Sequence, residues 1–194
     1  MKSKTKPPQT TYQLHVTLVD IEPPIWRRLL VPCSMTLRNL HDILQIAFDW
    51  EDYHLHAFKT KDKYFEDPDI NPETNGIYEK KVRLDQVLLK VKSAMIYEYD
   101  FGDGWEHNIL LEKILPFDVK QKLPIFLGGE RSGPPEDCGG FSGYEVLLDA
   151  IKDPKHPEHE EMLDWLGEDF DPEYFNLDKI NKELARLYHK KRKS

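Results

Sequence analysis

The chain of 194 residues has few cysteines: Cys33 and Cys138 are too few for a disulfide framework or a four-cysteine zinc site. A reducing compartment is therefore the simplest expectation, although a single bridge between the two stays open. Long apolar runs are also missing, and residues 1–11 are polar and basic, unlike a secretion signal. We expect a cytoplasmic protein with no membrane-embedded segment.

An excess of positive charge is likewise absent, because the formal net charge is -8 at pH 7. Proteins that coat nucleic acid or anionic membrane need basic surface, so we expect no tight binding to generic DNA. The hydrophobic fraction of 39%, with nine Phe, nine Tyr and four Trp, favours a folded globule. The length fits a single domain, and no internal repeat is visible.

The first part of the chain predicts two antiparallel strands and a helix. Residues 12–18 alternate apolar and polar side chains, which is the period-two pattern of a half-buried strand. After a Pro-Pro break, residues 25–31 predict a second strand that returns antiparallel to the first. Leucines then recur at spacings of three and four, which predicts a core-facing helix capped by Ser34 or Thr36 and ending near Asp49.

The next segment, HLHAF, is a strand candidate. His54 and His56 lie two residues apart, so on a strand they project from the same face. Residues 67–76, with two prolines and an Asn-Gly pair, predict a loop, and residues 84–90 predict a short helix.

Residues 94–111 predict a β-hairpin around a Gly-Asp-Gly turn, because aromatic and branched residues flank the turn on both sides. A three-residue turn with Gly104 in the left-handed conformation sets Phe101 opposite Trp105. In this register all the large apolar side chains share one face, whereas a two-residue turn would scramble both faces.

The same register sets Asp100 against Glu106 on the other face, with Asp103 at the turn. Facing carboxylates repel each other unless water, a cation or a proton relieves them. One interpretation is a small acidic site that His107 reaches through strand twist. The other is a solvated polar face on a hairpin whose opposite side is core.

The second informative stretch is PPEDCGG, residues 134–140. Its glycines and the helix that follows would suit an anion, but two acidic residues repel one, which favours a shaped connection over a ligand loop. Cys138 has no neighbouring base, so a structural cysteine is expected. Ser142 and Glu145 match a capping box for a helix to about Lys152, and residues 177–187 predict a final amphipathic helix.

These elements predict a single α+β domain. We expect a mostly antiparallel sheet with a central β-hairpin, covered by helices, and a helical C-terminal third. The expected organisation is a flexible leader over residues 1–11, the domain over residues 12–188 and a basic tail over residues 189–194.

The motifs YDFGDGWEH and PPEDCGGFSGY, together with PPIWRRLLVP and HLHAF, resemble the plasmid pRiA4b ORF-3-like family. The resemblance runs from about Tyr12 to Leu187, with the motifs in the family's order. It implies an α+β fold and an association with plasmids and other mobile elements, and it assigns no activity. The resolvase label of some members finds no counterpart here, since no serine-recombinase nucleophile pattern is recognisable.

Polar and ionisable residues gather at the ends of three separate segments, where binding sites tend to form. We therefore predict one ligand-binding cleft lined by His54, His56, Asp100, Asp103, His107, Glu136 and Asp137. A divalent metal is the candidate cofactor, since imidazole and carboxylate donors suit zinc, manganese or iron. Its predicted ligands are His54, His56, Asp100 and Asp103.

Two functional hypotheses follow. In the favoured one the protein is a binding or accessory module of mobile elements, holding a protein, peptide or small molecule between the hairpin and the PPEDCGG loop. In the alternative it is a metal-dependent, hydrolase-like enzyme that uses the histidines and carboxylates. The first is preferred because spacing assembles no complete catalytic set.

Overall fold

The computed structural model describes residues 10–167 and 170–191, and within them it shows one mixed sheet and a set of helices. The sheet has eight strands in the order β5-β4-β3-β6-β7-β1-β2-β8. Its strand pairs are antiparallel, apart from the parallel pair of β4 (Tyr64–Glu66) and β5 (Ile77–Tyr78). The predicted α+β domain with a mostly antiparallel sheet is confirmed.

The N-terminal strand pair is confirmed and lies inside the sheet, between the central hairpin strand β7 and the edge strand β8. The first strand, β1 (Thr10–Leu18), pairs with β2 (Trp26–Pro32) and, on its other edge, with β7 (Trp105–Pro116). Its apolar side chains, including Leu14 and Val16, are fully buried. The strand already starts at Thr10, two residues before the predicted start of the domain, and residues 1–9 of the predicted leader lie outside the described residues.

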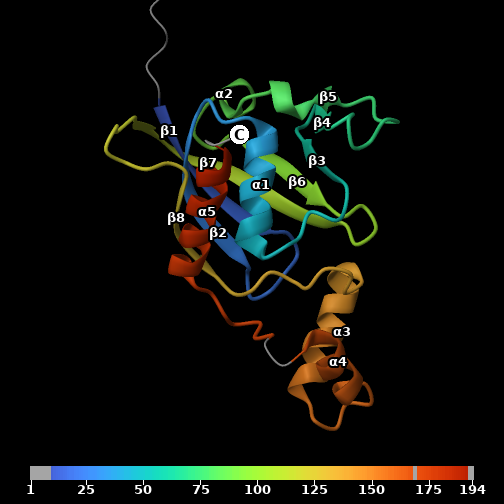
Figure 1. The fold of residues 1–194 in the computed structure, drawn as a ribbon. Helices are drawn as coiled ribbons and strands as arrows, with labels where there is room; N and C mark the ends of the chain where they lie inside the picture. The colour runs from blue at the N-terminus through green and yellow to red at the C-terminus, as the bar shows by residue number, and fades with distance from the viewer. Residues whose placement is uncertain (1–9, 168–169, 192–194) are drawn as a thin grey trace, which may run out of the picture.

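The predicted first helix is confirmed as α1 (Leu37–Phe48). Thr36 caps it, because its hydroxyl oxygen accepts a hydrogen bond from the Asn39 amide at 3.3 Å, and Asp49 ends it in the left-handed conformation. The helix crosses one face of the sheet (Figure 1) and buries Leu40, Leu44 and neighbouring residues in the core.

The predicted central hairpin is present, but its predicted register is wrong. The strands β6 (Ala94–Tyr99) and β7 pair Tyr99 with Trp105, so that residues 100–104 form a five-residue loop. Asp100 leaves the strand in the left-handed conformation with φ 57°, and its carbonyl accepts a hydrogen bond from the Gly104 amide at 2.6 Å. The predicted left-handed Gly104 is confirmed, with φ 70°.

The corrected register also changes the acidic face of the hairpin. Asp100 does not face Glu106; the residue opposite Glu106 is Glu98. A cation relieves these facing carboxylates, because Lys59 Nζ lies 2.5 Å from Glu98 and 3.6 Å from Glu106. This part of the acidic face is therefore a charge-paired strand surface.

Two further element boundaries differ from the prediction. The strand β3 (His56–Lys59) begins at His56, so His54 lies in the preceding loop, which turns through the left-handed residues Asp49 and Asp52. The helix α2 (Leu84–Val87) ends before the predicted residue 90. Between β5 and α2 a short 3₁₀ helix, η1 (Glu79–Lys81), follows the loop over residues 67–76.

The C-terminal third is helical, as predicted. After the edge strand β8 (Ile125–Glu130) come α3 (Gly140–Lys152), α4 (His159–Leu166) and α5 (Leu177–Lys191). Figure 1 shows α5 beside α1 on the same face of the sheet, whereas α3 and α4 form a helical pair that projects from it.

The third helix begins two residues before the predicted capping box. Gly139 and Gly140 both have positive φ, and the Gly139 carbonyl accepts the first helical hydrogen bond from Gly143, so the glycines set the start of the helix.

No described helix is both long and apolar enough to cross a membrane. Both cysteines are free, with Cys33 buried and Cys138 half-buried. Residues 192–194 of the predicted basic tail lie outside the described residues.

Candidate functional site

The tip of the central hairpin, residues 100–104, docks against the PPEDCGG loop. The Gly139 amide donates a hydrogen bond to the Asp103 carboxylate at 3.2 Å, and Gly140 packs against the Asp103 backbone carbonyl. The other end of the loop is held by Trp50, whose indole nitrogen donates to the Pro134 carbonyl at 2.8 Å. Two segments far apart in the sequence thus form one surface.

His54 lies between these two segments and joins them. Its Nδ1 is 3.6 Å from Asp100 Oδ2, and its Nε2 is 3.3 Å from Asp137 Oδ1. The three side chains differ in exposure: Asp100 is 12% exposed, His54 is 25% exposed and Asp137 is 73% exposed. The group, which we call the His54 cluster, is therefore open to solvent on the Asp137 side.

Glu136 extends this surface toward the start of β3. The hydroxyl of Tyr99 donates to one Glu136 oxygen, and the amide of Glu51 donates to the other at 3.0 Å. Burial and the nearby Glu136 charge both raise the pKa of Tyr99, which keeps it a neutral donor. Glu136 is thus a partnered carboxylate that fixes the loop.

The structure brings together His54, Asp100, Asp103, Glu136 and Asp137, but not the other two residues predicted for the cleft. His107 is fully buried beneath the sheet face, with its ring against Phe48 and Trp50. His56 points into the core at the start of β3. The predicted metal set is also divided, because His54 and His56 belong to different clusters.

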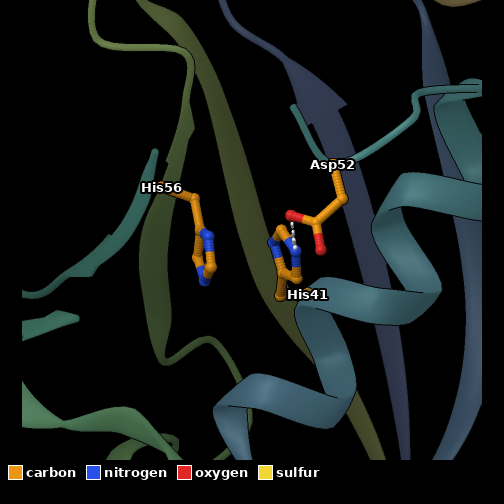
Figure 2. Close-up of side chains that lie close together, drawn as sticks. All are labelled: His41, Asp52 and His56. Carbon is orange, nitrogen blue, oxygen red and sulfur yellow. Dashed lines mark hydrogen bonds and ion pairs between the residues drawn. The ribbon is translucent and has the colours of Figure 1, made fainter. Parts of the chain in front are cut away.

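The second cluster consists of His41, Asp52 and His56 and was not predicted. One ligand atom from each lies within 4.8 Å of the others. Figure 2 shows the two imidazole rings face to face with Asp52 beside His41; the ring centroids are 3.6 Å apart and the planes differ by 15°. His41 comes from α1, Asp52 from the following loop and His56 from β3.

Oxygen partners hold both imidazole rings of this cluster. Nε2 of His41 donates to Asp52 at 2.8 Å, and Nδ1 contacts the Tyr97 hydroxyl at 2.8 Å. Nε2 of His56 lies 3.0 Å from the carboxylate of Glu79, which is fully buried. The sequence offers one signal for this site: His41 occupies a core-facing position of α1 among leucines, where a polar side chain needs a partner.

The ionisation of His41 and Asp52 follows from their surroundings. Burial lowers the pKa of His41, which favours a neutral ring. Burial alone would raise the pKa of Asp52, but the hydrogen bond from His41 and the charge and hydrogen bond of Arg38 outweigh it and lower the pKa to about 2. Arg38 contacts Asp52 at 3.0 Å, so the carboxylate stays ionised.

A groove with a volume of about 490 Å³ adjoins the His54 cluster between α3 and α4. It is mostly apolar and is lined by Asp137, Cys138, Ser142, Gly143, Val146, Leu147, Glu161, Met162 and Trp165. Burial and the charge of Asp103 raise the pKa of Cys138 to about 12. The thiol therefore stays protonated, which disfavours a role as a nucleophile. Cys138 is half-buried in the groove wall, whereas the sequence predicted a structural cysteine and no groove.

Comparisons with known proteins agree with this architecture. The chain is 37% identical over 177 residues to the uncharacterised protein y4hQ of Sinorhizobium fredii, covering 90% of this chain and 91% of that protein. A crystal structure of a protein of unknown function from Methanosarcina mazei Go1 superposes with a TM-score of 0.80 at 39% identity, covering 89% of this chain and 98% of the other. Residues 10–179 match the family described as plasmid pRiA4b ORF-3-like protein, and the chain belongs to that family.

Proposed function

We propose that the protein is a binding module that holds a peptide segment of a protein partner in the groove between α3 and α4. The segment combines apolar side chains, which fill the groove, with a basic side chain that reaches the His54 cluster. The supporting observation is the position of Asp137, which belongs both to the groove wall and to the His54 cluster. A single ligand in the groove therefore meets an apolar surface and an anionic end.

Exposure supports a site for a partner. Val146 is 47% exposed and Trp165 is 49% exposed, and both line the groove on neighbouring helices. Exposed aromatic and aliphatic side chains that line one hollow are typical anchors for a protein ligand. Glu161 lines the same groove, so acidic groups border it from α4 as well as from the loop.

Charge favours a basic ligand. The chain carries a net charge of -8. Asp137 lies in the groove wall, Glu136 precedes it in the loop, and Asp103 accepts a hydrogen bond from the Gly139 amide of the same loop. Complementary charge speeds encounter and selects against acidic partners. A basic and apolar segment satisfies both ends of the site.

The alternative of a metal-dependent hydrolase has no support from the relatives, whose descriptions name no activity. We propose a cytoplasmic role next to a partner encoded on mobile elements. The plasmid name of the family and the two free cysteines support this setting.

The test uses three labelled peptides and measures fluorescence anisotropy. One peptide combines Arg and Leu, the second replaces Arg by Glu, and the third replaces Leu by Ser. We expect binding of the first and much weaker binding of the other two, with amide shifts in an NMR spectrum confined to α3, α4 and residues 134–140.

Two variants address the two ends of the site. Asp137→Lys removes the anionic end and Val146→Ser removes an apolar contact, and each should weaken binding by about tenfold or more. Glu73→Lys makes the same charge change as Asp137→Lys at an exposed residue outside the groove and should bind like the wild type. Equal binding of the Arg and Glu peptides, or unchanged binding by both groove variants, would refute the proposal.

A further inference from the structure

We propose that His41, Asp52 and His56 form a binding site for a transition-metal ion, with zinc as the preferred ion. Two imidazoles and one carboxylate are the donors that catalytic zinc sites and non-haem iron sites use, and they leave further coordination positions open. The ligand atoms of the three residues already lie within 4.8 Å of one another. The site is independent of the peptide groove and of the His54 cluster.

The partners of the ring nitrogens leave one nitrogen of each histidine for an ion. Glu79 accepts a hydrogen bond from Nε2 of His56, which leaves Nδ1 of that ring as the free donor for a metal. In His41 the Tyr97 hydroxyl contacts Nδ1, so Nε2 is the nitrogen on the side of Asp52. Figure 2 shows the Nε2 contact as a dashed line. An ion would take the place of the proton that now bridges His41 and Asp52.

Each of the three candidate ligands also has a hydrogen-bond partner on its outer side. Metal-bound imidazoles donate their other N–H to an oxygen, and bound carboxylates are themselves hydrogen-bonded. His41 has the Tyr97 oxygen, His56 has the Glu79 carboxylate, and Asp52 accepts a hydrogen bond from Arg38 at 3.0 Å. All three ligands thus have the supports that orient ligands around an ion.

The carboxylates around the cluster favour a bound cation. Glu79 is 0% exposed, and its Oε1 has no hydrogen-bond partner among the described residues. The charge of Arg38 reaches Glu79, but the guanidinium of Arg38 is engaged by Asp52 at 3.0 Å and makes no hydrogen bond to Glu79 Oε1. A buried carboxylate without full compensation is costly, and a divalent cation beside His56 would offset it.

An ion can reach the three ligands from solvent, but one imidazole ring must move to bind it. Asp52 is 38% exposed, so an ion reaches the site along this side chain. The His41 and His56 rings are nearly parallel, whereas an ion lies close to the plane of each ring that binds it. We therefore expect one ring to tilt out of the stack when the ion binds.

The test is a titration of the full chain, freed of metal with a chelator, with Zn²⁺ and then Co²⁺. We expect one equivalent of Zn²⁺ by calorimetry, and Co²⁺ absorption bands that Zn²⁺ abolishes. Asp52→Asn should lose most of the affinity. Glu79→Gln, which changes only the outer partner of His56, should weaken binding by about 10- to 100-fold.

His54→Gln is the matched control, because it removes an imidazole from the neighbouring cluster and leaves these three ligands unchanged. It should bind Zn²⁺ like the wild type. Circular dichroism and the unfolding midpoint without metal establish whether each variant is folded. If the variant of the buried Glu79 is unstable, the Asp52→Asn variant still tests the site, because the Asp52 side chain is partly exposed. Failure of the wild type to bind, or loss of binding in His54→Gln but not in Asp52→Asn, would overturn the proposal.

Discussion

Gly140 packs against the backbone carbonyl of Asp103 so closely that no side chain fits between them. Gly140 starts α3 and Asp103 lies at the tip of the central hairpin, so this contact fixes the distance between the two segments that form the His54 cluster. Gly140 also has φ 67°, a conformation that L side chains rarely adopt. Two separate requirements therefore exclude a Cβ at this position.

The first prediction compares two glycines. Gly140→Ala should destabilise the protein clearly more than Gly104→Ala, because a Cβ at Gly140 meets Asp103 whereas nothing lies within 4 Å of one at Gly104. Both have positive φ, so both variants share a conformational cost of about 1 kcal/mol. Urea denaturation of both variants measures the difference. Equal midpoints would contradict the close contact.

The faces of the hairpin strands were predicted from the sequence, but their register was not. The shared face of Tyr97, Tyr99 and Trp105 was predicted correctly, since it depends only on the alternation of side chains. The register was wrong by two residues, and a shift of two leaves every side chain on its face. Apolar alternation therefore cannot separate the two registers.

The deciding contacts come from the Asp100 side chain. Its Oδ1 accepts hydrogen bonds from the amides of Gly102 at 2.9 Å and Asp103 at 3.3 Å, which stabilises the longer turn. Such contacts depend on the local backbone and were not inferred from the residue pattern.

The candidate sites were also predicted only in part. Loop residues with unusual composition were predicted to converge, and His54, Asp100 and Asp137 lie together in the structure. His41 was not predicted as a site residue, because it lies among the core-facing leucines of its helix. His56, the partner of His41, was predicted to lie beside His54, because two histidines separated by one residue point to the same face of a strand. The strand β3 begins only at His56, so this expectation does not apply to His54. Contacts between distant segments, such as that of His56 with Glu79, have no local signature.

The second prediction concerns Lys59. Lys59→Met should destabilise the hairpin by about 0.5–1 kcal/mol, since Glu98 and Glu106 then face each other without a cation. The loss should shrink at about 1 M salt, where exposed charges are screened. The double variant Lys59→Met with Glu98→Gln should regain most of the stability. A Lys59→Met variant as stable as wild type at low salt would show that the carboxylates do not repel.

The third prediction concerns nucleic acid: the protein should not bind random duplex DNA with submicromolar affinity at about 0.15 M salt. Arg28 is engaged by Glu112 at 2.8 Å, and Arg27 is buried with its guanidinium on the carbonyls of Ala47, Glu130 and Arg131. Neither arginine is available to a phosphate in this arrangement. An electrophoretic shift assay measures this, and tight binding that Arg28→Ala abolishes would contradict it.

The last prediction concerns pH and His107. Burial lowers the pKa of His107 from 6.5 to about 3, and its Nε2 has no hydrogen-bond partner among the described residues. In the unfolded chain the ring takes up a proton near its ordinary pKa, whereas the folded protein keeps it neutral. The contribution of His107 to stability is therefore complete above pH 6.5 and is lost progressively as the pH falls toward 3.

His107→Gln isolates this contribution, because the other histidines are the same in both proteins. Between pH 7 and pH 4.5 the wild type should lose on the order of 2 to 3 kcal/mol more stability than the variant, the equivalent of about two pKa steps of 1.36 kcal/mol each. Denaturation curves at the two pH values measure the difference. Parallel acid sensitivity of the two proteins would mean that water reaches the ring, since only a ring kept neutral by burial between Phe48 and Trp50 separates the folded from the unfolded pKa.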